Sequence, residues 1–169
     1  MAIQNNRYAD VPADSQITTA AAEFIEQSRY DNIPSAALVI GRRCVLDGMG
    51  LLAAGLNHET TILLAQVAAD QGGREDALLL GHGDERVPAA MAARVLGTAG
   101  HAHDWDDSQV STDPDHVYGL LTHPTIPALT AALVIAQARG TVTGKDFMLA
   151  FLTGFEVECK ISEWMFSQH

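Results

Sequence analysis

The sequence predicts an all-α domain. Hydrophobic residues make up 47% of its 169 residues and charged residues 18%, which is the balance of a folded domain with one sizeable core. Aromatic residues are only 6%, while alanine and leucine are abundant, and small apolar side chains let helices approach one another closely. Apolar residues also recur at helical spacings between residues that typically begin and end helices.

Six segments carry this helical pattern, and polar stretches or turns separate them. We expect helices over residues 16–28, 35–56, 59–70, 87–96, 127–139 and from residue 143 onward. The first residues of the chain, 1–13, are polar, so we expect a flexible N-terminal arm. The helical domain then spans residues 14–169.

The first three helices have recognisable boundaries. Asp14 or Ser15 can cap the first helix. Pro34 suits the first turn of the second helix, where its missing N–H costs nothing. This second helix is apolar nearly all round, so we expect it to be central and buried. The third helix ends at Gly72-Gly73, a common stop signal.

The second half of the chain contains a long polar stretch. Residues 77–80 are apolar and predict a short strand or an extended link. Residues 101–125 are rich in Asp, His, Pro, Ser and Thr, which predicts a long loop. Gly140 closes the helix that follows, and Thr143 with Asp146 fits a capping box at the start of the last helix.

Charge and hydropathy exclude several classes of protein. The net charge is −11, from 21 acidic and 10 basic side chains, whereas a nucleic-acid surface needs a basic patch. The N-terminus lacks the pattern of a signal peptide, and no apolar run approaches the roughly 18 residues that span a membrane. We therefore expect a cytoplasmic protein that binds neither nucleic acid nor membrane.

Some polar and sulfur-containing side chains lie outside the long loop, and we expect structural roles for them. Cys44 and Cys159 each lie in an apolar helical segment, which predicts two buried thiols. Arg42 and Arg43 could bind substrate carboxylates, but ion pairs with Asp47 or with a neighbouring helix are the simpler expectation.

The densest polar cluster lies in the long loop. It comprises His101-Ala102-His103-Asp104-Trp105-Asp106-Asp107-Ser108, followed by Thr122-His123-Pro124. Imidazole and carboxylate groups bind Zn, Fe or Mn, so the cluster could be a metal centre. It could also be a solvated acidic loop that caps helix ends. The third interpretation is acid–base chemistry, in which a histidine moves a proton on the carbon next to a carbonyl and hydroxyls hold substrate carboxylates.

The same residues resemble the signature of the MmgE/PrpD family. Members have a helix ending Asn-Gly, then a His-x-x-Asp-aromatic-Asp-Asp-Thr/Ser loop, then His-Pro-Ser/Thr. This chain carries the loop from His101 to Ser108, and then His123-Pro124-Thr125. Flanking helices are similar too, so the resemblance covers about residues 16–165.

The resemblance implies the N-terminal part of a larger helical enzyme that acts on a small di- or tricarboxylate. The family includes 2-methylcitrate dehydratases, cis-aconitate decarboxylases and an iminodisuccinate epimerase, which share proton chemistry beside a carboxylate without metal or cofactor. His123 then matches the catalytic histidine and Asp104 an active-site aspartate. The substrate-binding residues expected on this basis are Ser108, His101, His103 and Thr122.

Three departures from the family pattern leave the substrate open. Leu96 replaces the usual Asn, and His103 stands where an apolar residue is common. The gap between Ser108 and His123 is also longer than in several members, and its insert, residues 110–119, could reshape the pocket.

A lyase, either a dehydratase or a decarboxylase, is the first expectation, and three alternatives stand beside it. They are a dicarboxylate epimerase, a metal-dependent hydrolase that uses His101, His103 and the aspartates, and a non-catalytic fragment or one subunit of a split enzyme. The last helix has no stop signal, and its Trp164, Met165 and Phe166 call for burial. We therefore expect the polypeptide to continue, or a partner to cover this end, either a second copy in a homo-oligomer or a complementary C-terminal chain. The family places further catalytic residues, including a lysine, beyond the matched stretch.

Overall fold

The computed structural model describes residues 16–110 and 120–166, with side chains omitted at 120, 121 and 163–166. The predicted arm and most of the predicted insert lie outside the described residues. Helices dominate, which confirms the all-α class. The helical elements are α1 (Ile17–Gln27), η2 (Tyr30–Asn32), α2 (Ser35–Gly55), α3 (Glu59–Gln71), α4 (Ala89–His101), α5 (Thr125–Arg139) and α6 (Gly144–Phe166). The strands are β1 (Ala77–Leu78), β2 (Arg86–Val87), β3 (Gln109–Val110) and β4 (Leu120–Thr122).

Helix boundaries follow local signals in the sequence. Gly140 adopts a left-handed conformation, with φ 72°, directly after α5, as a helix-ending glycine should. The predicted capping box at α6 is confirmed: the Asp146 N–H donates to Thr143 Oγ1 at 3.1 Å, and that hydroxyl donates to Asp146 Oδ2 at 2.7 Å. The predicted caps of α1, Asp14 and Ser15, fall outside the described residues.

The long loop predicted over residues 101–125 is partly wrong. Helix α4 continues to His101, five residues beyond its predicted end. Strands β3 and β4 then pair antiparallel, with Gln109 opposite Thr122. These strands of two and three residues are too short for any periodicity to predict them.

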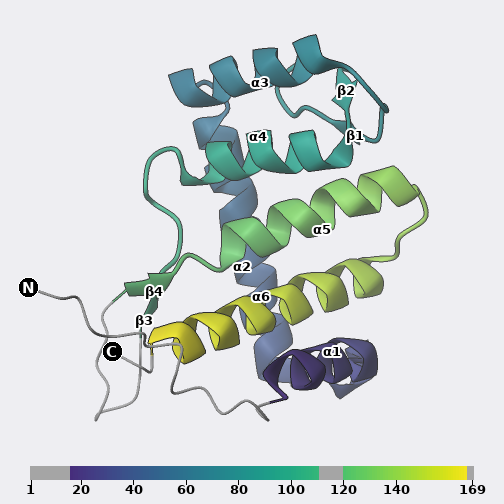
Figure 1. Cartoon of the computed structure of the whole chain (residues 1–169), viewed down its shortest axis with the longest axis vertical. Coiled ribbons are helices and arrows are strands. Elements are labelled where there is room, and N and C mark those ends of the chain that lie inside the picture. The colour runs from purple at the N-terminus through teal and green to yellow at the C-terminus, as the bar shows by residue number, and fades with distance from the viewer. Residues whose placement is uncertain (1–15, 111–119, 167–169) are drawn as a thin grey trace, which may run out of the picture.

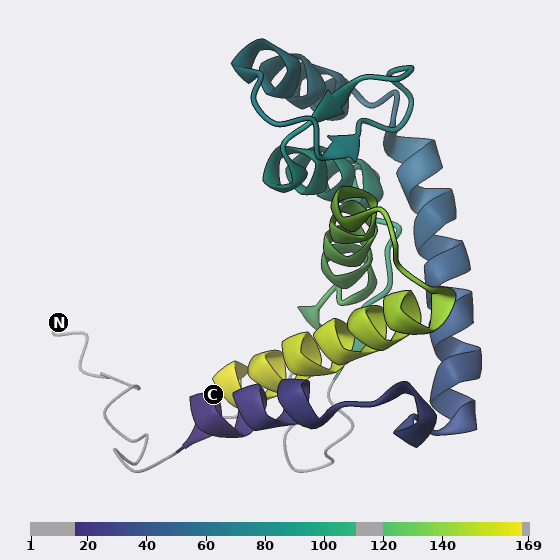
Figure 2. The same ribbon diagram turned by 90° about the vertical axis from the view of Figure 1, so that its right-hand side faces the viewer.

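Helices α3, α4, α5 and α6 stack one after another along α2, and α1 lies beside α6 (Figures 1 and 2). Three glycines of α2 make this stacking possible. A Cβ at Gly41 would meet Leu152 of α6, one at Gly48 would meet Leu129 of α5, and one at Gly55 would meet Ala99 of α4. Seven residues of helix rise about 10.5 Å, close to the spacing of packed helices. Helices α6, α5 and α4 therefore each cross α2 at a position without a side chain.

The core lies between successive helices of the stack, and Leu52 of α2 joins it. Its large buried side chains are Leu52, Leu79, Leu96, Leu129 and Phe151. Among residues 16–110 and 120–166, every helix is too short or too polar to cross a membrane.

The prediction that the second helix is central and buried is wrong. On α2, Ile40 is 58% exposed and Leu46 76% exposed. Helices α4, α5 and α6 all pack on one flank of α2, so its opposite flank stays uncovered by any described residue (Figure 2). The prediction of two buried thiols is correct for Cys159 only. Cys44 is half-buried, because it lies on α2.

Candidate active site

His123 lies between the end of β4 and the start of α5, and Asp107 holds it there. The His123 Nδ1–H donates to the Asp107 carbonyl at 2.9 Å. Because a carbonyl oxygen can only accept, this bond assigns the proton of the neutral ring to Nδ1. The Asp107 carboxylate also accepts from the Thr125 backbone N–H at 3.1 Å and hydroxyl at 2.7 Å, so it caps α5. Nε2 of His123 is therefore left with a free lone pair.

Asp106 lies buried between two imidazole rings. The residue is 7% exposed. Its Oδ1 accepts a hydrogen bond from His101 Nδ1 at 2.8 Å and lies 3.8 Å from His123 Nδ1. The two rings are 4.9 Å apart, centroid to centroid. Helix α4, which ends at His101, and helix α5, which starts after His123, thus bring the two histidines together across a shared carboxylate.

Asp104 faces the free nitrogen of His123. Its Oδ1 lies 4.0 Å from His123 Nε2, and its side chain is largely exposed. Asp104 has φ 56°, and no other non-glycine residue of the described ranges has a positive φ. Its backbone N–H donates to the His101 carbonyl at 3.0 Å in the turn that follows α4. Aspartate tolerates this left-handed conformation better than most residues, and such backbone is common at functional sites.

The remaining predicted site residues occupy different surroundings. His103 stacks on Trp105, with 4.5 Å between ring centroids, and meets the edge of His58. Ser108 is exposed, and no hydrogen bond joins its side chain to another described residue. The Thr122 hydroxyl donates to Glu158 Oε1 at 2.8 Å. Because this hydrogen bond uses its only proton, the hydroxyl cannot also donate to a substrate.

The sequence alone did not point to Glu158 as part of this site. Burial raises the pKa of the Glu158 carboxyl, and the nearby charge of Asp107 adds to this effect. The Thr122 hydroxyl and the charge of His123 act in the opposite direction. Its hydrogen-bond partner is 36 residues away in sequence, so no local pattern could mark it.

Four residues of the site could also hold a metal ion. His101, Asp104, Asp106 and His123 each offer one ligand atom, and these atoms lie within 4.8 Å of one another. Two imidazoles with two carboxylates form a donor set that suits Zn²⁺, Fe²⁺ or Mn²⁺.

The site is rich in acids and lacks a paired cation. Among the described side chains, no lysine or arginine forms an ion pair with Asp104, Asp106 or Asp107. Arg43 lines a pocket with Asp47 and Asp107. Ion pairs of Arg42 and Arg43 with Asp47 or with a neighbouring helix were expected, but neither arginine forms an ion pair with a described residue.

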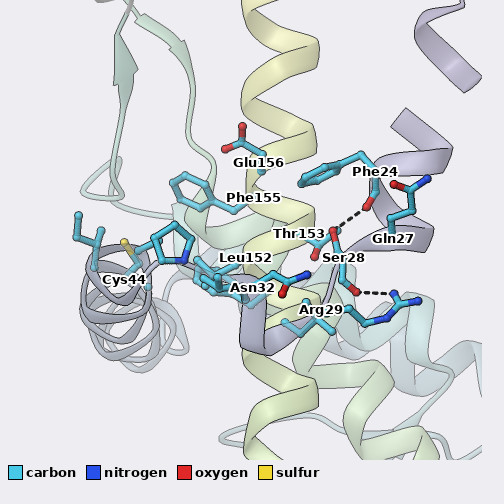
Figure 3. Close-up of a pocket in the computed structure, with 17 residues that line it drawn as sticks. Phe24, Gln27, Ser28, Arg29, Asn32, Cys44, Leu152, Thr153, Phe155 and Glu156 are labelled. Carbon is cyan, nitrogen blue, oxygen red and sulfur yellow. Dashed lines mark hydrogen bonds between the residues drawn. The ribbon is translucent and has the colours of Figure 1, made fainter. Parts of the chain in front are cut away.

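A larger cavity lies apart from the site, between α1, η2, α2 and α6 (Figure 3). Its volume is about 540 Å³. The side chains of Phe24, Leu152 and Phe155 form much of its apolar wall, with Arg29 and Glu156 among its polar residues. None of the residues that line it belongs to the cluster around His123.

Comparison with known proteins agrees with this architecture. The profile of the MmgE/PrpD N-terminal domain matches residues 19–169. The chain belongs to the MmgE/PrpD family. Two curated relatives of this MmgE/PrpD chain are the cis-aconitate decarboxylases of Mus musculus and Homo sapiens, each 26% identical over 148 residues. The alignments cover 86% of the chain but only 28% and 29% of those relatives. The chain thus spans less than a third of their length.

Proposed function

We propose that this MmgE/PrpD chain contributes the proton-transfer half of a lyase site that acts on a small di- or tricarboxylate. The observation that carries the proposal is the hydrogen bond from His123 Nδ1–H to the Asp107 carbonyl. It fixes the tautomer and leaves Nε2 as a base that faces Asp104. The cis-aconitate decarboxylase relatives favour chemistry of this class.

The proposed reaction moves one proton through His123 Nε2. In a dehydration, Nε2 takes the proton from the carbon next to a carboxylate, the C–O bond breaks, and the hydroxyl takes up that proton and leaves as water. In a decarboxylation, Nε2 first takes a proton from solvent, the bond to CO₂ breaks, and the imidazolium gives its proton to the carbon that keeps the electron pair. In both cases the imidazolium lies between the carboxylates of Asp104 and Asp106, which stabilise its positive charge.

Binding of a polycarboxylate requires positive charge that the described cluster lacks. Three aspartates surround the histidines, and carboxylates close to them would repel an anionic substrate. Ser108 can donate one hydrogen bond, and His101 and His103 remain proposed contacts. We therefore propose that cationic side chains come from a further part of the polypeptide or from a partner chain, as in a homodimer or a split enzyme. Native mass measurement of the purified protein would test whether such a partner is bound.

The test of the proposed base is His123→Gln in the intact enzyme. We expect turnover of cis-aconitate or 2-methylcitrate to fall by about a hundredfold or more, because general acid–base groups contribute roughly 10²–10⁴-fold. His82→Gln is the matched control, since His82 lies in the turn between β1 and β2. Circular dichroism must show that both variants fold. Full turnover by His123→Gln would refute the proposal.

Analysis of the reaction products distinguishes the reactions that this site could catalyse. Release of water or of CO₂ identifies a dehydratase or a decarboxylase. Exchange of a substrate proton with deuterated water, without loss of either fragment, identifies an epimerase.

A second candidate function is a metal-dependent hydrolase, because four ligand atoms of the site lie within 4.8 Å of one another. Elemental analysis of the purified protein tests it directly. Stoichiometric zinc or iron that turnover requires would favour the hydrolase over the lyase.

A further inference from the structure

We propose that Glu158 is a positioning residue that aligns His123 through Thr122, an inference that rests on the proposed role of His123. Glu158 lies on α6, which packs against β4. Its Oε1 accepts the Thr122 hydroxyl proton at 2.8 Å, across a sequence separation of 36 residues. Thr122 is the last residue of β4, and the next peptide carries His123. The bond therefore ties the strand end that presents the imidazole to a helix.

The imidazole is anchored from both sides in this arrangement. On the strand side, α6 holds Thr122 through Glu158. On the helix side, the Asp107 carboxylate holds Thr125, and the Asp107 carbonyl holds the ring itself. Without the Glu158 bond, the Thr122 side chain would lose its tie to α6, and the strand end would be held by its pairing with β3 and by Asp107. A base must stay within hydrogen-bond reach of the proton that it takes, so looser anchoring should lower turnover.

The presence of a carboxylate at position 158, rather than an amide, indicates that Glu158 does more than accept the hydrogen bond from Thr122. A glutamine oxygen could accept the same hydroxyl proton without placing a charge in a half-buried position. Burial and Asp107 instead raise the pKa of Glu158, which means that its charged form is disfavoured where it stands. The interaction of Glu158 with His123 partly offsets that cost. A negative charge at Glu158 also favours the imidazolium that forms when Nε2 takes a proton, in addition to the hydrogen bond that holds Thr122.

The experiment uses four single variants and one double variant of the intact enzyme. Thr122→Val removes the hydroxyl with little change in shape, and Thr122→Ser restores it. Glu158→Ala removes the acceptor of the hydrogen bond. Glu156→Ala is the matched control, because Glu156 lies two residues away on the exposed face of α6, 4.0 Å from Lys160.

We expect Thr122→Val and Glu158→Ala each to lower kcat by about tenfold to a hundredfold with little change in KM, the scale expected when a catalytic group is misplaced. Thr122→Ser and Glu156→Ala should keep the wild-type kcat. The double variant of Thr122→Val with Glu158→Ala should lose no more than the worse single variant, because both changes break the same hydrogen bond. Wild-type kcat in both single variants, or fully additive losses, would overturn the proposal.

A second readout does not depend on turnover. NMR of the His123 ring should show an Nδ1–H that exchanges with water faster in Thr122→Val than in the wild type, because a looser strand end weakens the hydrogen bond to the Asp107 carbonyl. An unchanged exchange rate in Thr122→Val would overturn the positioning role. Failure of the proposed function would give a different result, because His123→Gln would then keep its turnover. The NMR measurement would still report whether Glu158 and Thr122 align the ring.

Discussion

Gly55→Ala tests the packing that brings the two histidines together. Gly55 lies where α4 crosses α2, and a Cβ added there would lie 1.9 Å from the Ala99 carbonyl oxygen and 2.7 Å from its carbon. Ordinary Cβ contacts are longer than 3.4 Å, so α4 would have to move outward by about 1.5 Å. The obstacle is backbone, so no change of side-chain rotamer can relieve it. Because α4 ends at His101, its displacement would also disturb the bond from His101 to Asp106.

The expected magnitude follows from two opposing effects. Replacement of glycine by alanine inside a helix stabilises it by roughly 0.5–1 kcal/mol. Overpacking of a core costs about 1–3 kcal/mol, and a clash with rigid backbone belongs at the upper end. We expect Gly55→Ala to lower the free energy of unfolding by about 2 kcal/mol or more, a large fraction of the roughly 5–15 kcal/mol that stabilises a typical domain.

The assay is urea denaturation followed by circular dichroism. Gly50→Ala is the matched control, because it lies in the same helix and no atom comes within 4 Å of the added Cβ. It should be as stable as the wild type or slightly more so. If Gly55→Ala were as stable as Gly50→Ala, α2 and α4 could not be in the close contact that the structure shows.

Three further predictions concern single polar groups. Burial raises the pKa of the Cys44 thiol, so at neutral pH it should react with iodoacetamide more slowly than a free cysteine; rapid labelling, detected by mass spectrometry, would contradict this. Asp107→Ala removes the cap of α5 and should lower the free energy of unfolding by about 1–2 kcal/mol in urea denaturation. Asp47 lines the same pocket without capping a helix, so Asp47→Ala should have little effect. Because the folded state raises the pKa of Glu158, the folded protein binds this proton more tightly than the unfolded chain does. The stability that Glu158 contributes is thus present below its ordinary pKa and is lost as the pH rises through the raised value. Between about pH 4 and pH 7 the urea midpoint of Glu158→Gln should therefore rise relative to wild type, and a constant difference would refute the shift.

Local signals in the sequence predicted most of the secondary structure. A helix ends or begins through hydrogen bonds to residues three or four positions away, so Gly140 and the Thr143–Asp146 capping box identify boundaries without knowledge of the fold. The motif from His101 to Ser108 with His123 likewise indicated the family, which the match over residues 19–169 confirmed.

Periodicity was less informative for α2. An apolar pattern shows that a face can be buried, but not how many neighbours will cover it. The spacing of Gly41, Gly48 and Gly55 was visible in the sequence, yet only the crossing of α6, α5 and α4 shows why each position lacks a side chain.

The chemistry of the site depended on tertiary structure for the same reason. The sequence by itself determined which residues could take part: three histidines, three aspartates and nearby hydroxyls. Only the fold decided that the Asp107 carbonyl holds His123 Nδ1, that Asp106 lies between two imidazoles, and that Glu158 bonds Thr122. These contacts join residues from 5 to 36 positions apart, and a distance of a few ångströms between such residues arises from packing, which no local pattern encodes.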